Sequence, residues 1–531
     1  MTDQAASLPT AQARYDELKT DRSPFLQRAR ECAALTIPSV LPPEGFSSSQ
    51  QLPTPYQSLG ARGSRTLASK LLLSLFPSVP FFQYKIDDLE IEKLGAKRGE
   101  IEKALSARER AVVTELDIAV FRPAAFMALL HLVVVGNVCL YVPPEKGGRC
   151  KAFRLDQYVT RRDAAGNLIE AVIQENVDFT ALPEEVRMAV AKQDAHKDHV
   201  ADSQAPAPVQ LYTHLMWDVK SQRWIVVQEV GGIQLPGSHG KYLPDELPFR
   251  FLRFSVQPGE SYGRSYVEEY LGDLDSLEAL SETLVEGSAA SARVVFMVRP
   301  GGTTSLKMVT DAKMGDVIPG NADDVGALQV QKQADLNVAK SQAEEIANRL
   351  AYAFLLHQSV QRSGERVTAE EIRYMASELD DGLGGVYTLL ASDFQLPIIR
   401  LLEKRMEKRL KAPKLPDGVV RPVIVSGLAG IGRGHDQRNL AAFLKEVIAV
   451  LTPELALRYL NPSEFISRTA ASYGIDTENL LRSAEEIEKE EQRQFLQKMI
   501  AHMGPEALKQ GGGMGQQVLK QSLSSGTPPN G

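Results

Sequence analysis

Apolar residues recur at helical spacing in two long stretches of the chain. The first advances by steps of three and four residues through Val267, Tyr270, Leu274, Leu277, Ser281, Leu284 and Ser288. The second repeats this stepping through Leu336, Ala339, Ala343, Ile346, Leu350 and Phe354. Such a seam is typical of helices that pack along their length. We therefore predict two long helices, the first of roughly 30 residues or about 45 Å, joined by short strands with Gly/Pro turns.

The part of the chain before these helices mixes helical and alternating patterns. The helical patterns cover Ala13–Ala34, 61–76, about Asp88–Ala119 and a stretch from Pro123, with strand patterns at 81–86 and Asn137–Val142. Residues 158–175 alternate on both sides of a Gly-Asn turn, and 209–230 alternate around Lys220–Arg223 with both tryptophans, Trp217 and Trp224. These two segments predict β-hairpins, with a short helix at 182–192 between them.

After the second long helix comes a short polar loop and then another helix. Thr368 with Glu371 three residues on predicts a helix start at Ala369. The helix passes Gly382, Gly384, Gly385 and Pro397 on its way to Lys411, so we expect bends near the glycines and the proline. A strand follows at 420–426. Residues 436–509 are predicted to be helical, and the tail from Gly511 is predicted to be disordered.

The first long helix changes character along its length. Its second part, Gly287–Ala292, contains only small residues, which allows neighbouring backbones to approach closely. Neither long helix has a polar face wide enough for a lone surface helix, so each needs more apolar neighbours than one chain supplies. Self-association is the economical explanation.

Composition and charge narrow the classes of protein. The chain has 531 residues, of which 43% are hydrophobic and 24% charged, and its formal net charge is −7. These values exclude global disorder and predict no general attraction for phosphate polymers or anionic membranes. The three cysteines lack C-x-x-C spacing, which favours a reducing compartment. No secretion signal or apolar stretch of about 20 residues occurs, so we expect no membrane contact.

The motifs that carry catalysis or cofactors in other proteins are incomplete here. The glycine run Gly430–His435 has His435 where a dinucleotide loop needs glycine, and no P-loop occurs. His196 and His199, with Asp194 and Asp198 beside them, form an H-x-x-H cluster in a polar loop, but a metal site would need more ligands and a rigid support. His131, His214 and His357 lie in apolar sequence surroundings and are interpreted as structural. We predict no enzyme activity, no cofactor and no metal.

Two arginines are left without an assigned role by these patterns. Arg362 and Arg366 lie in the Gly-containing loop between two long helices. The loop has either ordinary linker polarity or faces something that passes by, and the local pattern leaves both interpretations open.

Four stretches of the sequence carry a resemblance to a known family. They are Pro55–Pro77, residues 132–142, Gly259–Leu280 and above all residues 359–390, which read SVQRSGERVTAEEIRYMASELDDGLGGVYTLL. They closely resemble the portal proteins, or head-to-tail connectors, of short-tailed, podovirus-type phages, and the match is collinear from about Tyr15 to Ile500.

The resemblance implies an α+β, mainly helical portal fold with wing, stem, clip and crown regions, assembled as a ring. The implied regions are a disordered N-terminus (1–12), the wing (13–261), a stem helix (262–292), the clip (293–333), a second stem helix (334–358), a tunnel loop (359–368), a long wing helix (369–411), a wing strand (412–435), the helical crown (436–509) and a disordered tail (510–531).

The function implied by the resemblance is structural. A ring of typically twelve subunits would lie at one capsid vertex of the virion, after synthesis in the host bacterial cytoplasm. Double-stranded DNA would pass through it without sequence specificity, driven in by the terminase large subunit and later ejected. The other implied partners are the major capsid protein, scaffolding proteins and tail adaptor proteins.

The resemblance also suggests site residues. Those of the tunnel loop that would face the DNA channel are Gln361, Arg362, Ser363, Gly364 and Arg366. Those that would pack subunits together in the stem are Leu274, Leu277, Leu284, Ser288 and Ala289. Because the chain is acidic, the channel would repel phosphates, and only a few inward arginines would touch them.

Two alternative functions remain. One is another ring-forming virion part, such as a tail adaptor or tube protein, which the chain length and the paired long helices disfavour. The other is a packaging enzyme, such as a nuclease or nucleotide hydrolase, which would need acidic metal clusters or a P-loop.

Overall fold

The computed structural model describes most of the chain up to Glu407 and a few short segments beyond it. The described residues are 9–47, 49–77, 81–86, 98–118, 120–144, 148–194, 208–291, 295–313, 315–328, 333–356, 379, 382–383, 385–407, 420–424, 443–447 and 449. The chain divides into two compact units, Met1–Ile431 and Gly432–Gly531. In the second unit the described residues are helical. All elements below belong to the first unit.

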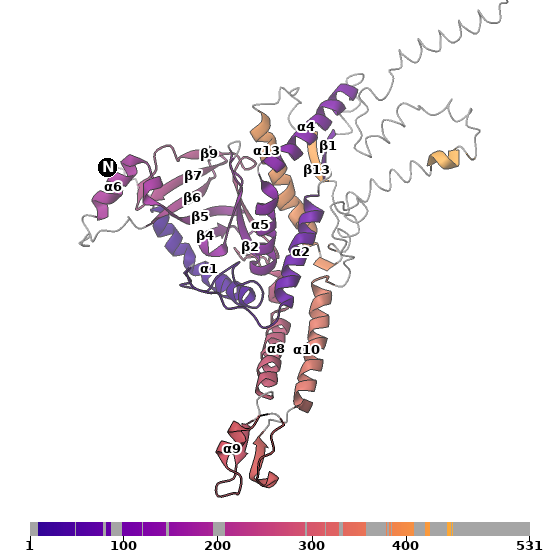
Figure 1. The fold of residues 1–531 in the computed structure, drawn as a ribbon. Coiled ribbons are helices and arrows are strands. Elements are labelled where there is room, and N and C mark those ends of the chain that lie inside the picture. Colours follow the sequence, from indigo (N-terminus) through magenta and orange to yellow (C-terminus); the bar gives the residue numbers. More distant parts are fainter. Residues whose placement is uncertain are drawn as a thin grey trace, which may run out of the picture. The chain divides into compact units, whose positions relative to one another are not determined.

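A six-stranded antiparallel sheet forms one layer of the first unit (Figure 1). Its strands are β4 (Tyr158–Arg162), β5 (Leu168–Val177), β6 (Val209–Asp218), β7 (Arg223–Val230), β8 (Ile233–Gln234) and β9 (Gly240–Tyr242), with β9 paired to β7. Both predicted hairpins, β4–β5 and β6–β7, are confirmed. Trp217 and Trp224 are cross-strand partners with ring centroids 5.5 Å apart.

Helix α1 (Ala11–Ala34) lies across this sheet. Its buried residues Ala11, Tyr15 and Leu18 form one apolar cluster with Val159, Val172 and Tyr212 of the strands. The predicted amphipathic helix is confirmed, and its apolar face covers the sheet. The polar segment after β5 contains the 3₁₀ turn η3 (Phe179–Ala181) and helix α6 (Glu184–Asp194).

The main core surrounds helix α5 (Phe121–Val135), whose second half is buried on all sides. It packs on α2 (Leu59–Leu75) and on a three-stranded sheet of β10 (Phe249–Arg253), β2 (Asn137–Tyr141) and β3 (Lys151–Phe153). The 3₁₀ turn η2 (Leu155–Gln157) then leads into β4. Helix α5 ends at Gly136 (φ 80°), where a Cβ would lie 2.5 Å from the backbone carbon of Arg264, so only glycine fits there.

No described helix is by itself long and apolar enough to span a membrane. One pair, Ala107–Ile118 and Phe121–Val135, meets the length and composition criterion jointly but is bent by 76°.

The C-terminal elements of the first unit pack against elements from its N-terminal part. Strand β13 (Val420–Ile424) pairs antiparallel with β1 (Phe82–Ile86), and helix α13 (Leu396–Glu407) packs on α4 (Arg98–Ile118). Before α13 come α12 (Val386–Leu390) and a π-helical turn at Ala391–Gln395. The break predicted at the glycines is confirmed, since Gly385 has φ 87° and directly precedes α12. Near Pro397, which lacks an amide hydrogen to donate, the structure has the π turn, which ends two residues before the proline.

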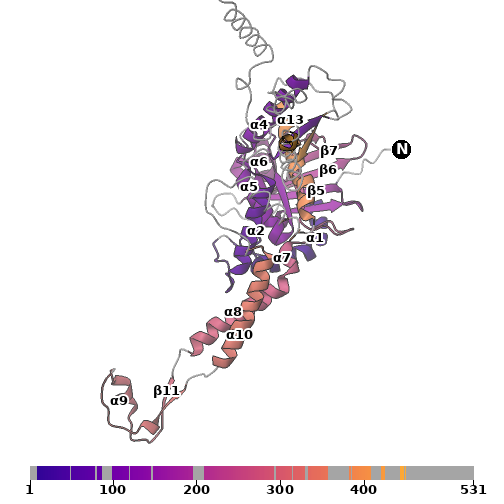
Figure 2. The same ribbon diagram turned by 90° about the vertical axis from the view of Figure 1, so that its right-hand side faces the viewer.

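A pair of long helices with strands at its far end completes the unit (Figures 1 and 2). The chain runs through α7 (Tyr266–Glu269), α8 (Leu271–Ser291), β11 (Val295–Val298), α9 (Leu306–Asp311), the turn η4 (Ala322–Asp324), β12 (Val325–Leu328) and α10 (Gln333–Ala353). Strands β11 and β12 pair antiparallel, and helix α9 between them was not predicted.

The single helix expected over 262–292 is divided in the structure. Helix α7 begins only after Ser265, which caps it by accepting a hydrogen bond from the Glu268 amide at 3.0 Å. Tyr270 (φ −112°, ψ 15°) then separates α7 from α8. Helix α10 ends at Ala353, before the predicted end at His357.

Candidate functional site

Helices α8 and α10 are held together along their length in antiparallel orientation. Leu274 and Leu277 of α8 and Leu350 of α10 are buried in the core, which confirms the predicted seams. Near one end of the pair, Arg349 Nη2 donates to Asp273 Oδ1 at 3.0 Å. Near the other end, Gly287 approaches Leu336 so closely that a Cβ would lie 2.9 Å from its methyl group. The two helices therefore form one continuous arm, which we call the stem.

Aromatic rings join the stem to the rest of the unit. The Tyr266 hydroxyl donates to the Ala353 carbonyl at 2.8 Å, and the Phe354 ring lies 5.7 Å from Tyr266 and 5.9 Å from Tyr270. On its other side Phe354 meets Gly63 of α2, where a Cβ would lie 2.6 Å from the ring. The end of α10 is thus fixed against both α7 and α2.

The far end of the stem carries a compact turn under β11 and β12. The Asp324 carboxylate is buried and its Oδ2 accepts from the Thr303 hydroxyl and from the amide and hydroxyl of Thr304. Gly302 packs directly on this carboxylate, because a Cβ there would lie 2.6 Å from Asp324 Cγ. We call residues 295–328 the distal module.

One face of α8 carries three exposed carboxylates. Asp275, Glu282 and Glu286 are exposed and recur at spacings of seven and four, so they share one side of the helix. Between Leu271 and Ser291 the sequence has no Lys or Arg. Glu278 points elsewhere: its carboxylate accepts from the amides of Tyr56 and Gln57 at 2.7 and 3.1 Å. We call the three exposed carboxylates the acidic stripe.

Large apolar side chains are exposed on the stem and the distal module. On the stem these are Val285, Val338 and Tyr352, the last with 70% of its surface exposed. On the distal module they include Leu306, Met308 and Val317, of which Val317 is 97% exposed. Exposed apolar side chains gathered on neighbouring elements are typical of surfaces that bind another protein.

The stem residues suggested by the sequence divide into two groups. Leu274 and Leu277 are buried within this chain, so they pack its own core. Leu284 is half-buried at the α8–α10 contact, and Ser288 and Ala289 are exposed near the end of α8. Only the last three have surface to offer a neighbouring subunit.

The suggested tunnel-loop residues Gln361, Arg362, Ser363, Gly364 and Arg366 lie outside the described residues, as do His196, His199, His357 and Gly430–His435. The described residues on either side of the tunnel-loop segment lie together. The Leu355 carbonyl accepts a hydrogen bond from Lys70 Nζ at 2.9 Å. The Leu355 side chain lies near Gly382, where an added Cβ would be 3.7 Å from it.

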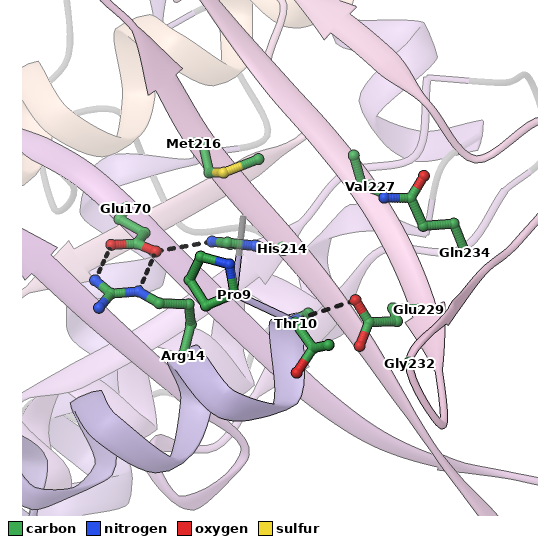
Figure 3. A pocket seen from close by; sticks show the side chains of 11 residues that line it. Pro9, Thr10, Arg14, Glu170, His214, Met216, Val227, Glu229, Gly232 and Gln234 are labelled. Atoms are coloured by element: carbon green, nitrogen blue, oxygen red, sulfur yellow. Dashed lines mark hydrogen bonds and ion pairs between the residues drawn. The ribbon is translucent and has the colours of Figure 1, made fainter. Parts of the chain in front are cut away.

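A polar cluster that the sequence did not predict lies between α1 and the sheet (Figure 3). Glu170 of β5 accepts from Arg14 Nε and Nη2 at 2.9 and 2.6 Å, and His214 Nε2 lies 2.8 Å from Glu170 Oε1. Burial alone would raise the pKa of Glu170, but the hydrogen bonds from His214 and Arg14 lower it to about 2.

This cluster agrees with the interpretation of His214 as structural and shows how it acts. His214 lies in an apolar stretch of sequence, yet its ring is bonded to a carboxylate rather than packed among apolar groups. The register of β5 on β6, which pairs Val172 with His214, brings Glu170 to the same face. The long segment between the two strands hides that pairing, since only strands joined by short turns reveal their register locally.

The described residues contain no group of three or more His, Cys, Asp or Glu side chains arranged to hold a metal ion. His131 is buried. Desolvation, together with the nearby Arg154 charge, lowers its pKa to about 4 and keeps it neutral.

Comparisons of the sequence with known proteins find similarity to phage portal or connecting proteins. Residues 8–481 match the family described as "Bacteriophage head to tail connecting protein". The chain is 40% identical to the portal protein of Escherichia phage T7 over 507 residues, covering 94% of this chain and 93% of that protein. It is 40% identical to the portal protein of Enterobacteria phage T3 over 519 residues, covering 96% and 94%.

More distant similarities extend the comparison. The portal protein of Enterobacteria phage SP6 is 28% identical over 513 residues, covering 96% of each chain. Among solved structures, a chain from the neck of an empty GTA particle covers 79% of this chain and 90% of its own length, at 13% identity and a TM-score of 0.37.

Proposed function

The chain belongs to the bacteriophage head-to-tail connecting proteins, the portal proteins of podovirus phages, and from this membership we propose that it acts as a closed ring through which the genome passes. Its role as a structural connector between head and tail follows from the family. The ring, its contacts and the path of the DNA are the parts that we propose.

Ring formation is supported by side chains that one chain leaves uncovered. Val285, Val338 and Tyr352 are exposed on the stem, although apolar side chains of this size are usually buried. Ser288 and Ala289 are exposed and small, which suits a close approach of a neighbouring α8. We propose that twelve copies close the ring, with Leu284, Ser288 and Ala289 at the contact between stems.

The observation that carries the proposed DNA channel is the acidic stripe. Exposed carboxylates at Asp275, Glu282 and Glu286, with no cation on the same helix, form a surface that repels phosphates. Facing inward in a ring, this surface would let duplex DNA slide without binding. Arg362 and Arg366, in the segment that follows α10, would supply the few contacts with the backbone.

The partners are assigned by region. The wing (13–261, with 369–435) would meet the capsid and scaffolding proteins, and the crown (436–509) would face the capsid interior. The distal module, with its exposed Leu306, Met308 and Val317, would bind the terminase large subunit and later the tail adaptor. The assembly would lie at one capsid vertex of the virion, after synthesis in the host cytoplasm.

An image of the purified oligomer, viewed down its axis by electron microscopy, tests the proposal. We expect a closed ring of twelve subunits with the stems lining a central opening wide enough for duplex DNA. A compact particle without an opening, or a ring with α8 on its outer surface, would contradict it.

A further inference from the structure

A pocket of about 270 Å³ opens where the first turn of α1 meets the sheet face of β5 to β8 (Figure 3). Its charged or titratable lining consists of Arg14, Glu170, His214 and Glu229. The register of β6 on β7 pairs Tyr212 with Glu229 and His214 with Val227, so these side chains share one face. The proposed connector function uses none of them.

Glu229 is the residue whose bonding is incomplete. Its side chain is only 7% exposed, and Oε2 accepts from the backbone amide of Ala11 at 3.0 Å. This contact places a negative charge at the N-terminus of α1, where the helix dipole favours it. The other oxygen, Oε1, is buried and has no hydrogen-bond partner within the described residues. A buried carboxylate oxygen without a donor is costly.

The remaining charges of the pocket already satisfy one another. Arg14 donates to Glu170 through two nitrogens and also pairs with Glu17 on its outer side. His214 bonds to the same Glu170 carboxylate. Glu229 is therefore the one acidic group of this lining that has no cationic partner in the described structure, and the pocket lacks a donor rather than an acceptor.

We propose that this pocket binds one organic cation, an alkylammonium or guanidinium group that pairs with the Glu229 carboxylate. Met216, Val227 and Pro9 supply apolar contacts for the carbon stem of such a ligand. An organic cation fits better than a metal ion, because the described residues offer no cluster of three metal ligands. The inference stands independently of the connector function.

The test follows the methyl resonance of Met216 by ¹³C NMR in the full-length protein, with the signal assigned from a Met216→Leu variant. The probe is n-butylammonium, with 1-butanol as the neutral probe of the same shape, at constant ionic strength. We expect a saturable shift with butylammonium and none with butanol. The absence of a saturable shift, or an equal response to both probes, would overturn the proposal.

Three variants locate the binding. Glu229→Gln keeps an oxygen for the Ala11 amide but removes the charge, and should weaken butylammonium binding at least tenfold. Glu184→Gln on exposed α6 removes the same charge elsewhere and should leave binding unchanged. If Glu229→Gln fails to fold, Val227→Phe tests the site instead: it fills the pocket while keeping the Glu229 carboxylate, and should abolish binding. Unchanged affinity in a folded Glu229→Gln or Val227→Phe variant would refute the site.

Two further measurements distinguish the possible sources of the cation in the native protein. If a small free amine occupies the pocket, dialysis against high salt should move the Met216 resonance, and adding butylammonium should restore it. If a Lys or Arg side chain of a second protein chain occupies it, dilution that dissociates the oligomer should move the resonance instead.

Discussion

The hydroxyl of Tyr266 donates a hydrogen bond to the backbone carbonyl of Ala353, 87 residues further along the chain, at 2.8 Å. The bond joins the first turn of α7 to the last turn of α10, at the point where the stem leaves the main core. Because a helix leaves its last carbonyls without intrahelical partners, the tyrosine satisfies a group that would otherwise need water. The tyrosine side chain therefore helps to hold the end of α10 against α7.

Removal of this hydroxyl should loosen the base of the stem. In Tyr266→Phe the ring contact with Phe354 remains, but the Ala353 carbonyl loses its donor, and we expect the free energy of unfolding to fall by about 1 kcal/mol. Urea denaturation monitored by circular dichroism measures the change. Tyr56→Phe, at an exposed position outside the stem, is the control and should change stability by less than about 0.5 kcal/mol.

Two helical glycines should respond in opposite directions to the same substitution. A Cβ at Gly63 would lie 2.6 Å from the Phe354 ring, so Gly63→Ala should destabilise the protein by about 1–3 kcal/mol through overpacking. Gly272 has nothing within 4 Å of its Cβ position, so Gly272→Ala should raise stability by about 0.5–1 kcal/mol through helix propensity. Comparative denaturation of the two variants measures both effects, and a stabilised Gly63→Ala would contradict the close packing of α2 on Phe354.

The Arg14–Glu170–His214 cluster should stabilise the fold only while Glu170 is ionised. The folded pKa of Glu170 is about 2, below its ordinary value of 4.5, so its contribution is present above pH 4.5 and is lost as the pH falls toward 2. Glu170→Gln should lower the free energy of unfolding by about 1–2 kcal/mol at pH 6, less than the shift alone implies because the group is partly solvated.

The pH dependence separates this effect from a loss of packing. The stability difference between the wild-type protein and Glu170→Gln should shrink between pH 4.5 and 2, whereas Glu184→Gln should show no such trend. A difference that stays constant with pH would mean that the carboxylate charge contributes nothing.

Bulk added at the exposed small residues of α8 should prevent ring closure. Ser288→Leu or Ala289→Leu places a branched side chain where we propose that two stems meet closely, and overpacking of such contacts costs about 1–3 kcal/mol per site. Since a ring repeats the site in every subunit, native mass spectrometry should detect open or smaller assemblies. Val219→Leu, at an exposed hairpin turn of the sheet, is the control, and rings of normal size from the α8 variants would count against the proposed contact.

Local patterns predicted most of the elements but not the places where distant segments meet. The seam through Leu274 and Leu350 is present in the structure because burial along a helix leaves a period in the sequence. The break at Tyr270 leaves no such trace, since one non-helical residue does not shift the apolar positions that follow. The pairing of β1 with β13 was equally hidden, because each strand is short and they are separated by most of the unit.

In the candidate site, too, local features could be predicted from the sequence and contacts between distant segments could not. The absence of cations from α8 can be read directly from the sequence, and the exposure of Asp275, Glu282 and Glu286 follows from their spacing once the seam is known. The bond between Glu170 and His214 depends on strand register across a long segment, which no local pattern encodes. The roles of Arg362 and Arg366 rest on the family alone and stay a prediction.

Reversal of the acidic stripe should convert the proposed channel from a surface that repels DNA into one that binds it. Glu282→Lys with Glu286→Lys changes two exposed carboxylates of each α8 into ammonium groups. We expect the purified oligomer to bind duplex DNA at least tenfold more tightly than the wild-type protein, and the affinity to fall steeply with salt because each phosphate contact releases counterions. Fluorescence anisotropy of a labelled duplex at several salt concentrations measures both effects.

The matched control is Glu184→Lys with Glu185→Lys, which reverses two exposed charges on α6 and gives the same net charge. If the repeated inward stripe is what faces DNA, the stem variant should bind more tightly than this control, because a ring would place its lysines around one duplex whereas those of α6 would be spread over the outer surface. Infection should distinguish the variants in the same way, with genome delivery slowed only by lysines on the stem. Equal DNA affinity of the two variants would place α8 outside the channel.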